Sequence, residues 1–436
     1  MSDATWAGVA VAGVTGAYAL ASRRLASTPV SGAIVFTAAG VLLGPLCLDL
    51  ISLDTVGGPL LTLLEAALTL VLFTDAMAVR PRELRTGAAL PGRLLGFGLV
   101  LSIALGWLLA WPLLPGLTVW ELALVGAVLA PTDAALGTSA IANPRVPALV
   151  RQGLNVESGL NDGMVLPFFV LFLAAIPGTS YAEEGEAGTF WRALLLSTAL
   201  GLAVGGGGGR LLRWSSGRGW ITGEWRSLHV LAVAAASYGL AVATQGSGFI
   251  AAWVAGFAFA AAERSVAAAP VPEDDRSADL AEYLGSLLAL LSLLVFGAVI
   301  LGPTLEQLDW RIVLYAVLSL TVVRMVPVAL SLAGSGLRLP TVAYIGWFGP
   351  RGLASIVLGL LVVEQHVPGV ELIGRVVAVT VGLSVLLHGV TAVTLSDRYG
   401  RWYERAVARE PGLREGSGAP AVRRRRRFDL TGPPGR

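Results

Sequence analysis

Long apolar stretches are the feature that most constrains this chain. A helix that crosses a bilayer needs about 20 predominantly apolar residues, and the sequence contains about thirteen such stretches. Charged residues are 14% of the chain, whereas soluble globular proteins carry about 25%. We therefore predict an all-α polytopic membrane protein of about thirteen transmembrane helices. The stretches lie near 5–22, 30–48, 59–79, 94–114, 118–140, 153–176, 190–209, 227–244, 248–262, 281–302, 311–332, 340–363 and 372–394.

The arginines predict the orientation, because basic loops stay on the cytoplasmic side. One alternating set of predicted loops carries 15 arginines, and the other carries only Arg192 and Arg311. We expect a plasma-membrane protein with its N-terminus outside, its C-terminus in the cytoplasm and an odd number of spans. Residues 1–394 form the predicted transmembrane domain, and residues 395–436 form a basic cytoplasmic tail. That tail is either solvated or in contact with anionic membrane lipid.

The composition excludes several classes of protein. All 31 basic residues are arginine, so the chain has no lysine for a phosphate-binding P-loop or for a Schiff base. A single cysteine, Cys47, excludes a disulfide scaffold and a thiolate metal cluster. We expect no cofactor, no nucleotide and no nucleic-acid partner. An ion gradient is then the expected energy source.

An internal repeat links the two halves of the chain. Residues 31–40 and 247–256 are identical at five of ten positions, at an offset of 216. Pro131 in the fifth stretch has a counterpart in Pro350 of the twelfth. Both matches relate helix n to helix n+7, so the two copies enter the membrane from opposite sides. This pattern predicts an inverted repeat of helices 1–6 and 8–13, which is typical of secondary transporters.

The fifth and sixth stretches contain polar residues that are costly in a membrane. Pro131 interrupts the fifth stretch, and Asp133 follows it. Asp133 is expected either at a cation site against an exposed helix N-terminus or in a structural cap. In the sixth stretch, Glu157, Ser158, Asn161 and Asp162 share one helical face within an arc of about 140°.

Two carboxylates on one face repel each other unless one gains a cationic partner or a proton. We expect Arg351, in Gly349-Pro350-Arg351-Gly352 of the twelfth stretch, to pair with Glu157. Asp162 would then lack a permanent counter-ion and could hold either a proton or a dehydrated cation. A purely structural polar cluster is the alternative. His388, on an apolar stretch, is expected to be a packing residue and not a proton relay.

These motifs resemble those of the monovalent cation/proton antiporters of the NhaP type, which are relatives of the sodium/proton exchangers. The resemblance covers nearly all of residues 1–394. Its specific parts are Pro131-Thr132-Asp133, the segment 157–163 and Gly349-Pro350-Arg351-Gly352, in that order. It implies a homodimer of thirteen-helix subunits in which the unwound helices 5 and 12 cross.

The resemblance also implies roles for individual residues. Asp162 would carry protons and cations alternately, and Na⁺ would also contact Glu157, Ser158 and the Thr132 carbonyl. Asn161 matches the electroneutral exchangers, with which the absence of lysine agrees, and Arg351 matches the arginine that pairs with the glutamate. The chain is then expected to be an antiporter of Na⁺, Li⁺ or K⁺ against H⁺, and not an enzyme.

Two other functions stay open at this point. An ion-coupled symporter or uniporter for a small organic solute could use the same inverted-repeat scaffold, and Trp347 and Phe348 near the broken helix leave room for it. An intramembrane hydrolase would need a Ser/His dyad or a pair of acids, and His388 is the only histidine well inside a stretch. The paired acids favour a bare cation.

Overall fold

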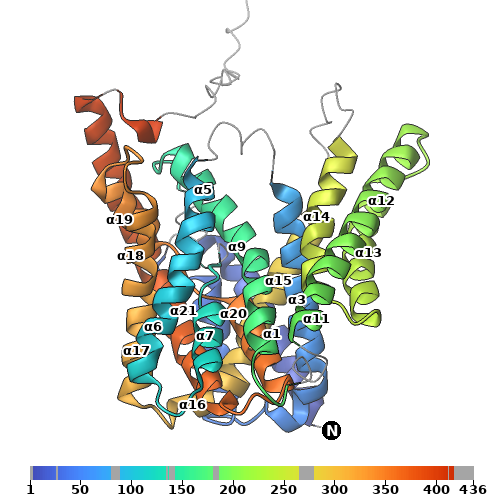
Figure 1. Ribbon diagram of the computed structural model, residues 1–436, viewed down its shortest axis with the longest axis horizontal. Coiled ribbons are helices and arrows are strands. Elements are labelled where there is room, and N and C mark those ends of the chain that lie inside the picture. The colour runs from blue at the N-terminus through green and yellow to red at the C-terminus, as the bar shows by residue number, and fades with distance from the viewer. Residues whose placement is uncertain are drawn as a thin grey trace, which may run out of the picture.

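The computed structural model describes residues 3–25, 28–79, 89–133, 136, 143–179, 186–264, 279–410 and 412–416. Secondary structure in these ranges is entirely helical, which confirms the predicted fold class (Figure 1). Residues 134, 135 and 137–140 of the fifth predicted span and half of the basic tail, residues 411 and 417–436, lie outside the described residues. The α-helices are α1 (Asp3–Leu25), α2 (Gly32–Leu43), α3 (Leu53–Ala78), α5 (Ala89–Arg93), α6 (Leu99–Leu113), α7 (Val119–Val128), α9 (Ala148–Ala174), α11 (Glu186–Trp191), α12 (Ser197–Gly217), α13 (Gly223–Ala243), α14 (Gly248–Arg264), α15 (Asp279–Phe296), α16 (Gly302–Leu305), α17 (Trp310–Leu320), α18 (Val322–Ser331), α19 (Leu339–Trp347), α20 (Leu353–Glu364) and α21 (Val370–Arg409).

Three short π-helical segments join α-helices into longer continuous spans. They are η1 (Leu94–Gly98), η3 (Arg192–Leu196) and η4 (Gly297–Leu301), and a 3₁₀ turn, η5 (Arg414–Gly416), follows α21. Among the described residues, nine helices are long and apolar enough to cross a membrane, and three shorter apolar helices accompany them. The protein is therefore a multi-pass membrane protein. The count of thirteen spans stays a prediction.

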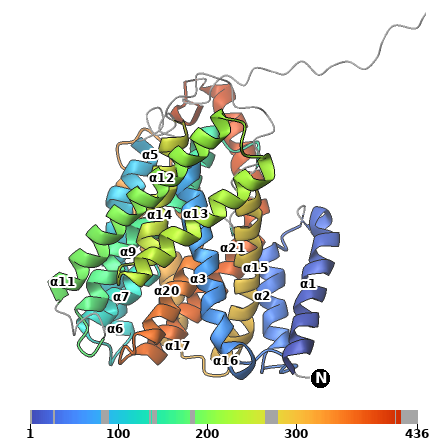
Figure 2. The same ribbon diagram turned by 90° about the vertical axis from the view of Figure 1, so that its right-hand side faces the viewer.

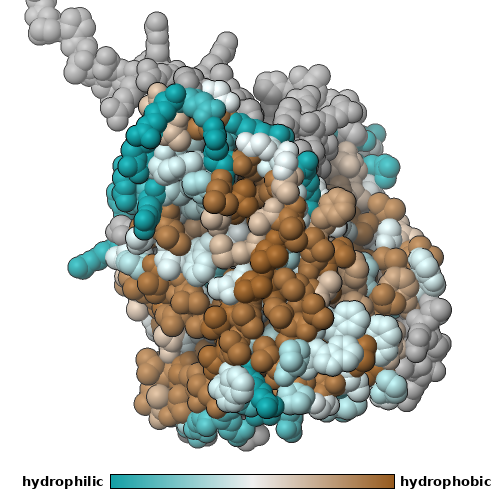
Figure 3. All heavy atoms as spheres, turned by 60° about the vertical axis from the view of Figure 1, so that its left-hand side comes forward, coloured by the Kyte–Doolittle hydropathy of each residue, from teal (hydrophilic) through white to brown (hydrophobic). Residues whose placement is uncertain are grey.

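The surface has the distribution that a bilayer requires. On the face shown in Figure 3, apolar side chains form a band across the middle of the molecule, and hydrophilic side chains gather toward its two ends. The N-terminus and the end of α21 lie at opposite ends of the helical bundle (Figure 1). Helix α1 stands at one edge beside α2 (Figure 2).

The run of glycines in α12 is a packing surface in the middle of a helix and not a helix end. A Cβ atom at Gly205 would overlap the backbone of Ala255 in α14, and one at Gly209 would overlap the carbonyl of Phe259. Because these glycines are spaced by four residues, they share the face on which α12 approaches α14. Small residues with this spacing allow the backbones of two membrane helices to come close together.

The two copies of the internal repeat begin with the same cap. The Ser31 hydroxyl accepts a hydrogen bond from the backbone N–H of Ile34, at 3.3 Å, at the start of α2. The Ser247 hydroxyl accepts one from Ile250, at 3.4 Å, at the start of α14. A serine in this position satisfies a backbone donor that the first helical turn leaves free.

The same two copies also pack in the same way. Gly40 of α2 lies directly against the carbonyl of Leu294 in α15, and Gly256 of α14 lies against the carbonyl of Phe73 in α3. Neither position has space for a Cβ atom. The identical serine and glycine of the repeat thus fix the start and the close packing of corresponding helices in both halves.

Helix α21 extends beyond the predicted last span, which ends near residue 394, and continues to Arg409. The segment that follows turns back toward the start of α19. Glu415 is buried there, and its Oε1 accepts hydrogen bonds from the Arg338 backbone N–H and the Thr341 hydroxyl, both at 2.8 Å. Arg338 also forms an exposed ion pair with Glu410. This segment therefore caps the N-terminus of α19.

Candidate cation-binding site

Two interrupted helices meet inside the molecule. Helix α7 ends at Val128, and residues 129–133 are not helical; α19 ends at Trp347, and α20 starts at Leu353. Pro131 and Pro350 lie in these interruptions. A proline interrupts a helix because it lacks a backbone N–H and its ring collides with the preceding turn. Irregular backbone at membrane depth is tolerated where protein surrounds it.

Hydrogen bonds connect the two interrupted helices to each other. The Asp133 backbone N–H donates to the Pro350 carbonyl at 2.8 Å. The Ser355 hydroxyl donates to the Val128 carbonyl at 2.7 Å. The expected meeting of the unwound segments in helices 5 and 12 is therefore present in the described part of both.

Asp133 lies at the N-terminus of α20. Its Oδ2 accepts a hydrogen bond from the backbone N–H of Leu353, at 3.1 Å, in the first turn of that helix. The positive end of the helix dipole favours a carboxylate there. Gly352 makes this approach possible, because a Cβ atom at that position would overlap the Asp133 carboxylate.

The expected ion pair between Arg351 and Glu157 is wrong. Arg351 is completely buried, and its Nη1 donates to the carbonyls of Ala130 at 2.6 Å and Pro131 at 3.0 Å. These carbonyls belong to residues in the non-helical segment 129–133. A guanidinium has five N–H donors in a fixed plane, so one group can serve two adjacent carbonyls.

Arg324 of α18 takes the place that Arg351 was expected to occupy. Its Nη1 and Nη2 donate to the two carboxylate oxygens of Glu157 at 2.5 and 2.8 Å. Both side chains are buried, with 5% and 3% of their surfaces exposed. Gly349 leaves space for this arginine, because a Cβ atom there would overlap the guanidinium. Glu157 therefore does have an arginine partner, but a different one.

The remaining polar residues of α9 face Thr132. The Ser158 hydroxyl donates to the Thr132 carbonyl, and the Asn161 amide donates to the Thr132 hydroxyl at 2.5 Å. Asp162 is 8% exposed, and its Oδ1 has no hydrogen-bond partner among the described residues. A buried carboxylate without a donor is costly unless it holds a proton or a cation. The carbonyl and hydroxyl oxygens around it are suitable ligands for a hard cation.

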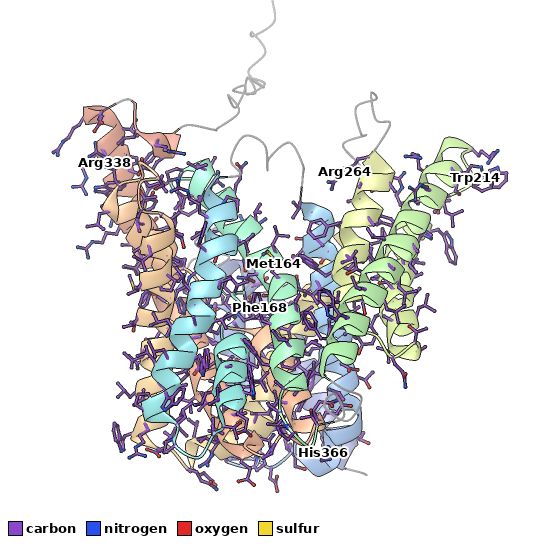
Figure 4. All side chains as sticks on the ribbon, in the orientation of Figure 1. Met164, Phe168, Trp214, Arg264, Arg338 and His366 are labelled. Atoms are coloured by element: carbon purple, nitrogen blue, oxygen red, sulfur yellow. The ribbon has the colours of Figure 1, made fainter. Side chains whose placement is uncertain are left out.

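The site lies near the middle of the apolar band. Met164, two residues after Asp162, is at mid-height in the molecule, between Arg338 at one end and His366 at the other (Figure 4). A second acid approaches the same helix from α3, where the Asp75 side chain would contact a Cβ atom added to Gly159 at 3.1 Å. Nothing in the sequence around Asp75 predicts that it lies next to α9.

The sequence did not predict the contacts that three residues, Arg324, Ser384 and His388, make around the site. Arg324 is visible as an arginine inside an apolar stretch, but nothing local points to its partner. Ser384 accepts a hydrogen bond from the Arg351 backbone at 2.7 Å, and His388 lies one turn further along α21. The four-residue spacing of Ser384 and His388 on an apolar stretch was the one signal for this pair.

The sequence of this chain is similar to those of known proteins. The family described as "Sodium/hydrogen exchanger, transmembrane" matches residues 9–397. The chain is 26% identical over 356 residues to the K(+)/H(+) antiporter NhaP of Alkalimonas amylolytica, which covers 79% of this chain and 58% of that protein. It is 26% identical over 275 residues to the Na(+)/H(+) antiporter 2 of Zygosaccharomyces rouxii, which covers 58% of this chain and 32% of that protein. The chain thus spans little more than half of the first relative and about a third of the second.

The fold has a counterpart among solved structures. The sodium proton antiporter MjNhaP1 of Methanocaldococcus jannaschii, determined at pH 8, superposes with a TM-score of 0.71. The match covers 91% of this chain and 98% of that one, at 18% sequence identity. At this level of identity the likeness concerns the arrangement of the helices.

Proposed function

This chain belongs to the sodium/hydrogen exchanger family, and on that basis we propose that it is a secondary active antiporter. It exchanges Na⁺ for H⁺ across the plasma membrane, with Li⁺ or K⁺ as the alternative cargo, and it is not an enzyme. Its N-terminus lies outside, and its C-terminus lies in the cytoplasm. Residues 1–394 form the exchanger domain, and residues 395–436 form the cytoplasmic tail.

The observation that carries this proposal is the state of the buried charges around α9. Glu157 is paired with Arg324, Arg351 serves two carbonyls, and Asp133 caps a helix. Asp162 has a buried oxygen without a donor in the described part of the chain. Among the acids of α9 and of the two interruptions, Asp162 is the one that we assign to the proton and the cation. The oxygens of Thr132 and Ser158 complete the cation site, and Asn161 orients Thr132. Glu157, which was expected to contact the cation as well, accepts from Arg324 with both of its oxygens and is left out of the proposed site.

One carboxylate with two competing occupants leads to one-for-one exchange. Asp162 binds either H⁺ or a monovalent cation, so the loaded site has the same net charge in both cases. Glu157 adds no net charge, because its arginine partner neutralises it. Alternating access of the loaded site to the two sides of the membrane then moves no net charge in a complete cycle, and exchange is electroneutral.

We also propose a homodimer embedded in membrane lipid. Only 6% of the apolar stretch of α1 is buried within one chain, although this helix carries exposed apolar side chains such as Trp6 and Leu20. The edge position of α1 leaves this face open to a second copy or to lipid (Figure 2). A second copy is the occupant that we favour, because the family resemblance implies a dimer.

The function can be tested with purified protein in liposomes that contain a pH-sensitive dye. An outward proton gradient or a cation pulse should produce a dye signal with Na⁺, Li⁺ or K⁺, and competition among the three cations ranks their affinities. A signal that requires an organic solute would instead identify a symporter or uniporter. Absence of a cation-dependent signal from folded protein would refute the proposal.

A further inference from the structure

Two buried side chains of α21 face the interruption between α19 and α20. Ser384 and His388 are 0% and 1% exposed and lie one helical turn apart. The backbone N–H of Arg351 donates to the Ser384 hydroxyl at 2.7 Å. The His388 ring places its Nε2 2.9 Å from the Trp347 carbonyl. The pair therefore contacts the interruption at both of its ends.

Each ring nitrogen of His388 lies 2.9 Å from a backbone carbonyl: Nε2 from that of Trp347 and Nδ1 from that of Ser384 in its own helix. A carbonyl can only accept, and a neutral imidazole has one N–H, so the neutral ring donates to one of the two. We assign the hydrogen to Nε2, because Nδ1 can then accept from the Ser384 hydroxyl, which is 3.3 Å away. In this tautomer His388 donates to the interrupted helix.

These contacts are connected to the backbone of the cation site through Arg351. Trp347 is the last residue of α19, and its carbonyl accepts a second hydrogen bond, from the Gly349 backbone N–H at 2.8 Å. Arg351 is held through its backbone by Ser384, and its side chain holds the carbonyls of Ala130 and Pro131. Thr132 follows directly. Hydrogen bonds therefore run without a gap from α21 to the segment that presents the Thr132 carbonyl.

We propose that Ser384 and His388 are positioning residues for cation binding. They fix the backbone of residues 347–351 and, through Arg351, the position of the Thr132 carbonyl relative to Asp162. Neither side chain touches the cation. The inference rests on the proposed antiport function, because it assigns these residues an effect on the affinity of that site.

A comparison of conservative and non-conservative variants tests this role. The variant His388→Gln can place an amide N–H near the position of Nε2, whereas His388→Leu has no donor. Ser384→Ala removes the hydroxyl that faces Arg351. Thr380→Val is the matched control, since Thr380 is also buried on α21 and donates within its own helix to Val376 at 2.7 Å.

The measurement is the apparent KM for Na⁺ and the maximal exchange rate in dye-loaded liposomes. We expect His388→Leu and Ser384→Ala to raise the apparent KM about 5- to 10-fold, the equivalent of one buried hydrogen bond. The maximal rate per folded molecule should change by less than about twofold, as expected for a loss of uniform binding. His388→Gln and Thr380→Val should keep the apparent KM of the unmodified protein.

Three results would overturn the inference. They are an unchanged apparent KM in both non-conservative variants, an equal change in His388→Gln and His388→Leu, or the same change in the Thr380 control. If His388→Leu does not fold, Ser384→Ala against Thr380→Val carries the comparison. Unmodified protein that shows no exchange would refute the proposed function itself, whereas normal exchange with unchanged variants would refute only the positioning role.

Discussion

At the scale of single residues, the Asp162 carboxylate decides whether the protein can exchange ions. The variant Asp162→Asn keeps the shape of the side chain but has no negative charge. It can therefore neither take up a proton nor neutralise a bound cation. We expect it to fold and to show no exchange above the level of empty liposomes. Asp397→Asn, the same change in a half-exposed ion pair with Arg145, should keep full exchange. Full activity of Asp162→Asn would remove the central assignment.

The buried pair of Glu157 and Arg324 gives a second prediction at this scale. Removal of one partner leaves a charge buried without compensation, which typically costs about 3–5 kcal/mol. Arg324→Ala should therefore lower the thermal unfolding temperature strongly. Arg338→Ala, which breaks a pair with about half of each side chain exposed, should cost at most about 1 kcal/mol. Scanning fluorimetry in detergent compares them, and equal effects would contradict a buried pair.

At the scale of secondary-structure elements, the approach of α12 to α14 depends on individual glycines. Gly205→Ala puts a methyl group against the backbone of Ala255 and should destabilise the protein by about 1–3 kcal/mol. Gly207→Ala is two residues away in the same helix, where nothing lies within 4 Å of an added Cβ atom. It should be neutral or stabilising, because alanine favours a helix over glycine by about 0.5–1 kcal/mol. Thermal unfolding that ranks the two variants in the opposite order would exclude close packing at Gly205.

The start of α19 gives the other prediction at this scale. Glu415→Ala removes a buried acceptor from the Arg338 backbone and the Thr341 hydroxyl. Because two buried donors then lack an acceptor, the free energy of unfolding should fall by about 1–3 kcal/mol. Glu410→Ala, in the exposed pair with Arg338, should have an effect within about 1 kcal/mol. Equal unfolding temperatures for the two variants would show that the segment 412–416 does not stabilise α19.

At the scale of the whole molecule, competition at one carboxylate predicts how transport depends on pH and voltage. At low pH the proton stays on Asp162 and keeps the cation out, and at high pH too few protons arrive to displace the cation. Exchange should therefore follow a bell-shaped pH profile. It should not change when a gradient of the permeant anion thiocyanate imposes a membrane voltage; an anion is used because K⁺ is one of the three candidate cargoes. A rate that follows the voltage would contradict one-for-one exchange.

Much of this architecture could be predicted because its causes are local. Apolar stretches of sufficient length become membrane helices, and Pro131 and Pro350 interrupt helices wherever those helices lie in the fold. The shared face of Glu157, Ser158, Asn161 and Asp162 follows from the helical period alone. The match of residues 31–40 with residues 247–256 likewise predicted that the two halves of the chain are related copies.

The partners of these residues could not be predicted in the same way. Arg324 and Arg351 are both arginines in apolar stretches near a proline, so the sequence does not distinguish them as partners of Glu157. The packing of α18 against α6 and α19 brings Arg324 to the carboxylate, and the interruption after α7 leaves two carbonyls to which Arg351 donates. By itself the sequence determined where helices form, where they break and which faces are polar, since these depend on neighbours along the chain. Which charges meet, and how Ser384 and His388 reach the interruption, was decided by the packing of helices that are distant in sequence.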